Sequence, residues 1–107
     1  MHRCRASRQH YAALYAQPGT MHAAFAQFAA FDQDAIDNKA FVAEGKLALP
    51  VPAIGGAKSF GPMMATVMRF AASDVSEEVI LDAGHWLMEE QPDATVKMVR
   101  GFLDTHK

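Results

Sequence analysis

The sequence predicts an α/β fold in which a helical first half precedes a strand-helix-strand-helix unit. Apolar residues recur at helical spacings of three and four through the first half of the chain. Two short apolar runs follow, at residues 47–56 and 77–83, and a helical stretch comes after each of them. Strands joined by a helix of this length pair in parallel through a right-handed connection. We therefore expect two parallel strands and two parts, a helical segment of residues 1–45 and a βαβα segment of residues 46–107.

Length and composition limit the classes of protein to which the chain can belong. It has 107 residues, of which 50% are apolar and 21% charged, as is typical of one soluble globular domain. The net charge is −2, and basic residues gather only near the N-terminus, so we expect no nucleic-acid partner. No apolar run is long enough to span a bilayer, and no secretory signal is visible, so we expect no membrane partner. The single cysteine, Cys4, cannot form an internal disulfide, which favours a cytoplasmic location.

Three helices are expected in the first half. The first contains Tyr15 and ends at the Pro-Gly break in "QPGT". Thr20 can cap the second helix, and the third begins at Asp32 or Asp34 and is ended by Gly45. The second helix has an apolar face that we expect to be buried, made of Met21, Ala24, Phe25, Phe28 and Phe31.

The second half contains the strand signals. "LALPVPAIGG" predicts a buried strand, but a central strand tolerates proline poorly, so Pro50 and Pro52 place it near an edge or loosen it there. The two glycines that end it are no phosphate loop, because no Lys-Ser/Thr pair follows, and we expect them to permit a sharp turn. "GPMMATVMRFAA" predicts a helix with Pro62 in its first turn, and "EEVILDA" predicts the second strand. The last helix begins at Pro92, with four residues facing inward: Val96, Val99, Phe102 and Leu103.

A histidine follows the second predicted strand, in "GHW". Open α/β sheets place their sites at the carboxyl ends of strands, so His85 is a candidate site residue. Taken alone, the pattern favours a histidine that caps the turn or the next helix. His85 and Glu89 could share a metal, but the other histidines do not fall at ligand spacing, so we expect no metal. Glu89 and Glu90 are more simply a solvated turn or a helix-start charge, and Asp82 is too close along the turn to align well with His85.

Three stretches, in this order, resemble the C-terminal third of an α/β-hydrolase. They are "YAQPGTMHAAFAQFAAFDQDAIDN", "LPVPAIGGAKSFG" and "VILDAGHWLMEEQPDATVKMVRGFL". The branch they resemble is the group of epoxide hydrolases and haloacid or haloalkane dehalogenases, and the resemblance covers Ser7 to Leu103. It implies that the helical segment is the end of a cap domain and the return to the core. The two strands would then be the last two of a hydrolase sheet.

The resemblance also implies a reaction. In that family an aspartate attacks the substrate carbon to form an ester, and a histidine activates the water that hydrolyses it. His85 matches this histidine, so it is the implied general base. The implied small-molecule substrate would contact Tyr15, Phe28 and Trp86, and no cofactor is implied. Relatives often carry tyrosines in the helix matching "FAQFAAF", where this chain has Gln27 and Phe28.

The rest of the catalytic machinery is missing from the sequence. No Gly-x-Ser/Asp-x-Gly elbow is present, and no carboxylate stands near Ser59, where many relatives place the acid. Two parallel strands also normally belong to a larger sheet. We expect the chain to be inactive alone, and a truncated or mis-started reading frame is the situation we favour. The alternatives are one half of a split hydrolase that docks onto an N-terminal piece, and a small non-catalytic module that self-associates or binds a partner.

Overall fold

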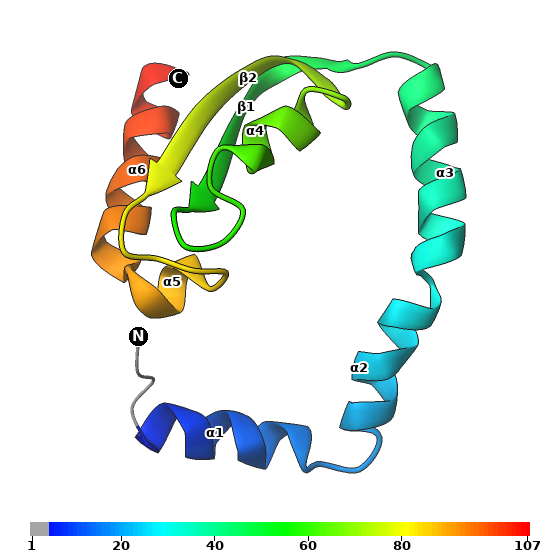
Figure 1. Cartoon of the computed structure of the whole chain (residues 1–107), viewed down its shortest axis with the longest axis vertical. Helices are drawn as coiled ribbons and strands as arrows, with labels where there is room; N and C mark the ends of the chain where they lie inside the picture. The colour runs from blue at the N-terminus through cyan, green and yellow to red at the C-terminus, as the bar shows by residue number, and fades with distance from the viewer. Residues whose placement is uncertain (1–4) are drawn as a thin grey trace. The chain divides into compact units, whose positions relative to one another are not determined.

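The computed structural model describes residues 5–107, which form six helices and two strands (Figure 1). The chain divides into two compact units, and the division lies between Glu44 and Gly45. No helix in this described range is long and apolar enough to cross a membrane. The first unit holds α1 (Arg5–Tyr15), α2 (Thr20–Ala29) and α3 (Phe31–Ala43). The second holds β1 (Leu47–Gly56), α4 (Met63–Met68), β2 (Ala72–Ile80), α5 (Leu87–Glu90) and α6 (Pro92–Thr105).

The three helices of the first unit bury none of their residues. The expectation of a buried face on α2 is wrong for this chain, because Phe25 and Phe28 are 65% and 60% exposed. The helices contact one another only sparsely, so no described residue of their unit buries the apolar stripe of α2. A stripe of this kind predicts that a face is apolar, but it does not supply the partner that buries it.

The ends of these helices differ in part from the prediction. Gly19 stands at the N-cap of α2 with a φ of 80°, and Thr20 is the first helical residue, so Thr20 is not a side-chain cap. Helix α3 begins at Phe31 rather than at an aspartate. Gly45 follows the end of α3 with a φ of 127°, a conformation that favours glycine, and its predicted role in ending the helix is confirmed.

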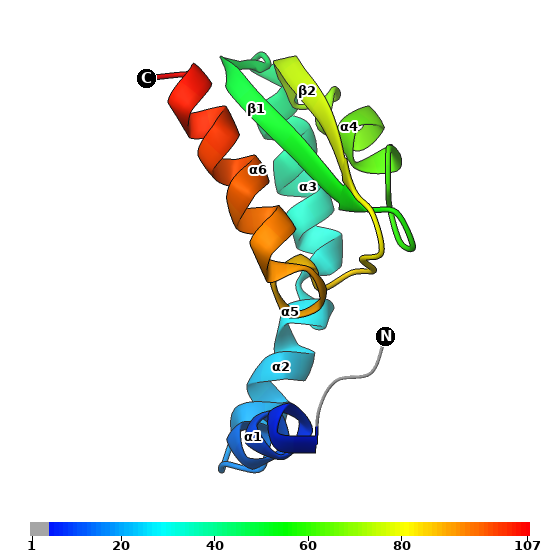
Figure 2. The same ribbon diagram turned by 90° about the vertical axis from the view of Figure 1, so that its left-hand side faces the viewer.

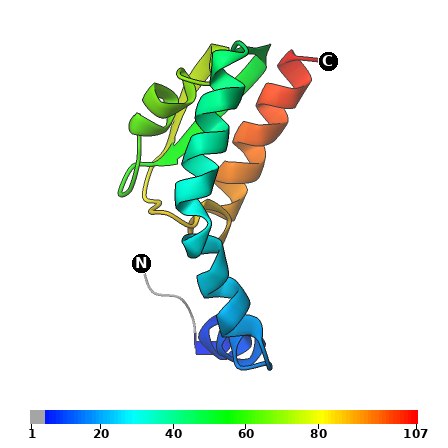
Figure 3. The same cartoon turned by 90° about the vertical axis from the view of Figure 1, so that its right-hand side faces the viewer.

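The second unit is built on a parallel pair of strands, which confirms the predicted α/β class. Strands β1 and β2 pair in the register Pro52 to Ser76 and Gly56 to Ile80. Figures 2 and 3 show α4 and α6 on opposite faces of this pair. Strand β1 has the predicted bounds, but β2 starts at Ala72 and ends at Ile80, instead of covering residues 77–83. The first half of β2 contains exposed polar residues, so an apolar run does not mark the start of this strand in the sequence.

The prolines of β1 lie on its outer edge. The N–H of Ala57, just past β1, donates to the carbonyl of Ile80 at 3.0 Å. Because successive N–H groups of a strand point to opposite edges, the odd-numbered residues of β1 face β2 and the even-numbered ones face away. Pro50 and Pro52 therefore stand where β2 requires no donor. The ladder is irregular between Leu47 and Pro50, so β1 is both loosened near its start and an edge strand of the described sheet.

The core of the second unit is small. Its buried apolar residues are mostly alanines, with Ala65 and Ala83 fully inaccessible and Ile80 2% exposed. Helix α6 starts at Pro92, as predicted, and its most buried residue is Thr95, at 6% exposed. Three of the four residues expected to face inward are instead exposed: Val96 (43%), Val99 (40%) and Leu103 (58%). Helix α6 has apolar residues on more than one face, and of its residues only Thr95, Met98 and Phe102 are buried or half-buried.

Candidate functional site

The loops that leave the carboxyl ends of β1 and β2 are joined through their backbones. The N–H of Lys58 donates to the carbonyl of Ala83 at 2.9 Å. This hydrogen bond follows the one from Ala57 N–H to the carbonyl of Ile80, one residue further along the chain after β1. This juxtaposition follows from parallel pairing, which brings the carboxyl ends of both strands to one edge. The edge at which open α/β folds place their sites is therefore formed by the segments after Gly56 and after Ile80.

The two glycines at the end of β1 have a more specific role than the sharp turn that we expected. A β-carbon on Gly55 would lie 2.1 Å from the carbonyl oxygen of Gly61, and one on Gly56 would lie 2.1 Å from that of Gly84. Neither distance is compatible with a side chain. Both positions therefore require glycine, because another backbone segment approaches each of them closely. The second approach matters here, since Gly84 immediately precedes His85.

His85 lies in the turn after β2, before α5, and its side chain is exposed. Its imidazole meets the indole of Trp86 edge to face, with ring centroids 4.7 Å apart and an interplanar angle of 86°. This geometry is the one that aromatic quadrupoles favour, and it limits the orientations of the imidazole. The arrangement leaves His85 accessible at the carboxyl edge of the sheet.

Glu90 holds the backbone on both sides of His85. Its Oε2 atom accepts the N–H groups of Gly84 and Trp86, each at 3.1 Å. Glu90 is half-buried, so the sequence expectation of a solvated turn or a helix-start charge is incomplete for this residue. Trp86 is the N-cap of α5. In a capping box the third helical residue accepts the N–H of the N-cap, and here the fourth helical residue, Glu90, does so. Sequence reasoning missed this role, although a Glu shortly after an N-cap was the available signal.

Asp82 does not serve as an evident partner of His85. Its Oδ1 lies 3.8 Å from Nζ of Lys58, and both side chains are mostly exposed. The backbone of Asp82 has a φ of 57°, in the left-handed region, and its carbonyl accepts a bond from the side chain of Gln91. The described geometry therefore assigns Asp82 to the connection between the two loops, in line with the expectation that it would not align with His85.

The candidate pocket residues fall in two different units. Trp86 contacts His85, as described, and is 56% exposed. Tyr15 is the last residue of α1 and is 49% exposed, and Phe28 lies on α2, where its ring packs at 5.1 Å from that of Phe31. Their part in a substrate pocket stays a prediction.

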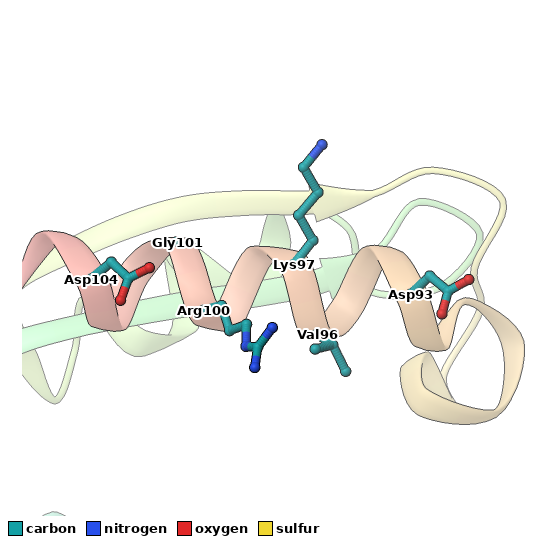
Figure 4. Close-up of a pocket in the computed structure, with 6 residues that line it drawn as sticks. All are labelled: Asp93, Val96, Lys97, Arg100, Gly101 and Asp104. Carbon is teal, nitrogen blue, oxygen red and sulfur yellow. The ribbon is translucent and has the colours of Figure 1, made fainter.

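Two shallow hollows lie along α6, and His85 lines neither of them. The first, of about 520 Å³, is an open groove on the outer side of the helix, with charged side chains spread along it (Figure 4). The second, of about 640 Å³, runs between α6 and β2 and includes Ser76, whose buried Oγ has no hydrogen-bond partner. Within residues 5–107 no group of three or more His, Cys, Asp or Glu side chains could hold a metal ion.

The fold defines the chain as an α/β protein with a parallel strand pair and an accessible histidine at the carboxyl edge. No protein-family model matches the sequence, and no curated protein matches it. The structure is similar to the crystal structure of wild-type Cfl2 from Burkholderia cenocepacia, with a TM-score of 0.87 and 29% sequence identity. The match covers 92% of this chain but 34% of Cfl2, so the chain spans about a third of that protein's length.

Proposed function

We propose that the chain is the C-terminal part of an α/β-fold hydrolase of the epoxide hydrolase or dehalogenase type, to which it contributes the general base His85. The observation that carries this proposal is the position of His85. It is exposed directly after the second of two parallel strands, on a turn packed against the end of the first strand. A base at this edge can reach a substrate that is bound over the sheet.

The chain requires a second polypeptide segment to perform this chemistry. The 107 residues include no Gly-x-Asp-x-Gly elbow to supply the nucleophile. The ester would therefore form on an aspartate of the other segment, and His85 would activate the water that hydrolyses it. The similarity to only a third of Cfl2 supports a larger parent fold. The outer edge of β1 and the exposed apolar residues of α6 are the surfaces on which such a segment would pack.

A complementation experiment tests this function. The chain is mixed with the N-terminal portion of an epoxide hydrolase that carries the Gly-x-Asp-x-Gly elbow and the cap, and turnover is measured on a panel of epoxides, haloalkanes and esters. The proposal predicts no turnover by either piece alone and measurable turnover by the pair. His85→Gln should lower this turnover by at least about 1,000-fold, whereas the control His22→Gln should leave it unchanged. A pair that assembles and turns over equally well with His85→Gln would contradict the proposal.

The second candidate is a non-catalytic interaction module, alone or as a self-associating chain. The observation in its favour is the unpaired edge of β1 beside exposed apolar residues, an arrangement that invites association. Light scattering measures whether the chain associates with itself or with the N-terminal piece, which an inert domain would not do. A stable monomer that binds neither itself nor the N-terminal piece would count against this second function.

A further inference from the structure

We propose that Glu90 is a positioning residue that fixes the turn carrying His85, and with it the imidazole, at the carboxyl end of β2. The catalytic consequence rests on the proposed function of His85, whereas the placement of the turn does not. One carboxylate oxygen of Glu90 accepts the amide N–H groups of Gly84 and Trp86, six and four residues earlier in the chain. These two residues flank His85 on either side, so the contact spans the base itself.

The geometry of the contact is that of an anion in a concave backbone site. Two N–H groups, with one residue between them, converge on a single Oε2 atom at equal distances of 3.1 Å. Converging amides of this kind favour negative charge, and hydrogen bonds to a charged acceptor are stronger than neutral ones. Glu90 and its bond to Gly84 are half-buried, which reduces the competition from water for that donor.

Gly84, which precedes His85, has no side chain that would crowd the carboxylate of Glu90. A β-carbon on Gly84 would lie 3.1 Å from Oε2 and 3.3 Å from Oε1 of Glu90, closer than ordinary contact. Gly84 therefore leaves the space through which Glu90 reaches the amides. On its other side, the carbonyl of Gly84 packs against Gly56 of β1. The turn is thus held from two directions, by the end of one strand and by a side chain of α5.

This arrangement has a consequence for the two steps of the proposed reaction. A base that is displaced by about 1 Å loses on the order of a hundredfold in the step in which it takes a proton. In the proposed mechanism that step is the hydrolysis of the ester, in which the imidazole takes a proton from the attacking water. Ester formation instead breaks the carbon–halogen or epoxide C–O bond as the carboxylate attacks, and it transfers no proton to His85. Loss of the Glu90 contact should therefore slow ester hydrolysis and leave ester formation nearly unchanged, which a general loss of folding would not do.

The placement is tested by NMR on the chain itself, with Glu90→Ala, Glu90→Gln and the control Asp93→Asn, which removes one exposed carboxylate from α6. We expect Glu90→Ala to raise the exchange rates of the Gly84 and Trp86 amide protons by at least about tenfold. The cross-peaks between the rings of His85 and Trp86 should weaken in the same variant. The amide proton of Ala57, which donates to the carbonyl of Ile80 at 3.0 Å, should stay protected from exchange and show that the ends of β1 and β2 remain paired.

The other two variants sharpen this test. Glu90→Gln keeps an oxygen acceptor but not the charge, so it should restore part of the amide protection, and Asp93→Asn should change nothing at the turn. Unchanged exchange and unchanged ring contacts in Glu90→Ala would overturn the inference. The complementation assay with Glu90→Ala provides a second test. Rates of ester formation and ester hydrolysis that fall by the same factor would also overturn the inference. A wild-type pair without turnover would contradict the function of His85, and the NMR measurements would still decide the role of Glu90.

Discussion

A β-carbon placed on Gly56 would lie only 2.1 Å from the carbonyl oxygen of Gly84. The end of β1 and the turn that carries His85 are therefore in direct backbone contact. The carbonyl of Ala83 would also lie 2.6 Å from this atom, so no side-chain movement could relieve the clash. It follows that the position of His85 at the carboxyl edge of the sheet depends on a glycine in the neighbouring strand.

The first prediction concerns this contact. Gly56→Ala should lower the free energy of unfolding by about 1–3 kcal/mol or more, because backbone atoms on both sides must shift to admit the methyl group. Urea denaturation followed by the fluorescence of Trp86, the single tryptophan, measures the change. A variant as stable as the wild type would show that the two backbone segments are not in contact.

Gly101 provides the matched opposite case. It lies within α6, and a β-carbon there would meet nothing within 4 Å. Gly101→Ala should raise the free energy of unfolding by about 0.5–1 kcal/mol, since glycine is a poor helix former and no clash offsets the gain. The same denaturation experiment measures it. A loss of stability would mean that another segment packs on α6 at this position.

A third prediction concerns the link between α5 and α6. The hydroxyl of Thr95 donates to the carbonyl of Gln91 at 2.7 Å and lies 3.2 Å from that of Leu87. Thr95 is 6% exposed, so Thr95→Val should remove this bond without changing the packed volume much. We expect a cost of about 1 kcal/mol, measured by thermal unfolding with circular dichroism. Thr105→Val is the control, because the hydroxyl of Thr105 makes a similar bond in an exposed position. A smaller effect at Thr95 than at Thr105 would be inconsistent with its burial.

A fourth prediction addresses association. The unpaired edge of β1 and the exposed Val96, Val99 and Leu103 of α6 should make the chain self-associate above its monomer mass of 11.7 kDa. Adding the N-terminal portion of a related hydrolase should convert these assemblies to a one-to-one complex, because both surfaces would then be covered. Light scattering of the chain alone and of the mixture measures both states. A monomer in both samples would contradict the packing role of these surfaces.

Several features of the fold could be predicted from the sequence because local signals carried them. Strand β1 combines a continuous apolar run with terminal glycines, Gly45 ends α3, and Pro92 begins α6. The start of β2 was missed since Ser73, Asp74 and Glu77 are polar and exposed, and the strand is recognisable there only from its pairing with β1. Strand propensity depends on such neighbours more than on the residues themselves.

Burial and the turn around His85 were harder to predict. Periodicity predicts that the apolar faces of α2 and α6 are buried, but it does not identify the surface that covers them. Phe25 and Val99 are exposed in the structure. The position of His85 after a strand could be read from "ILDAGHW". The hydrogen bonds from the amides of Gly84 and Trp86 to Glu90 could not be predicted from the sequence, because they depend on how the turn folds back onto α5.

The central claim, that His85 is the base of a two-step hydrolase, is tested most directly by trapping the ester. The His85→Gln chain is combined with the N-terminal portion of an epoxide hydrolase, an epoxide is added, and the intact masses of both pieces are measured over time. We expect the N-terminal piece to gain the mass of the substrate and to keep it, because the ester forms but is not hydrolysed. The wild-type pair should turn over without accumulating this adduct. If the His85→Gln pair releases product at the wild-type rate and no adduct persists, His85 is not the base.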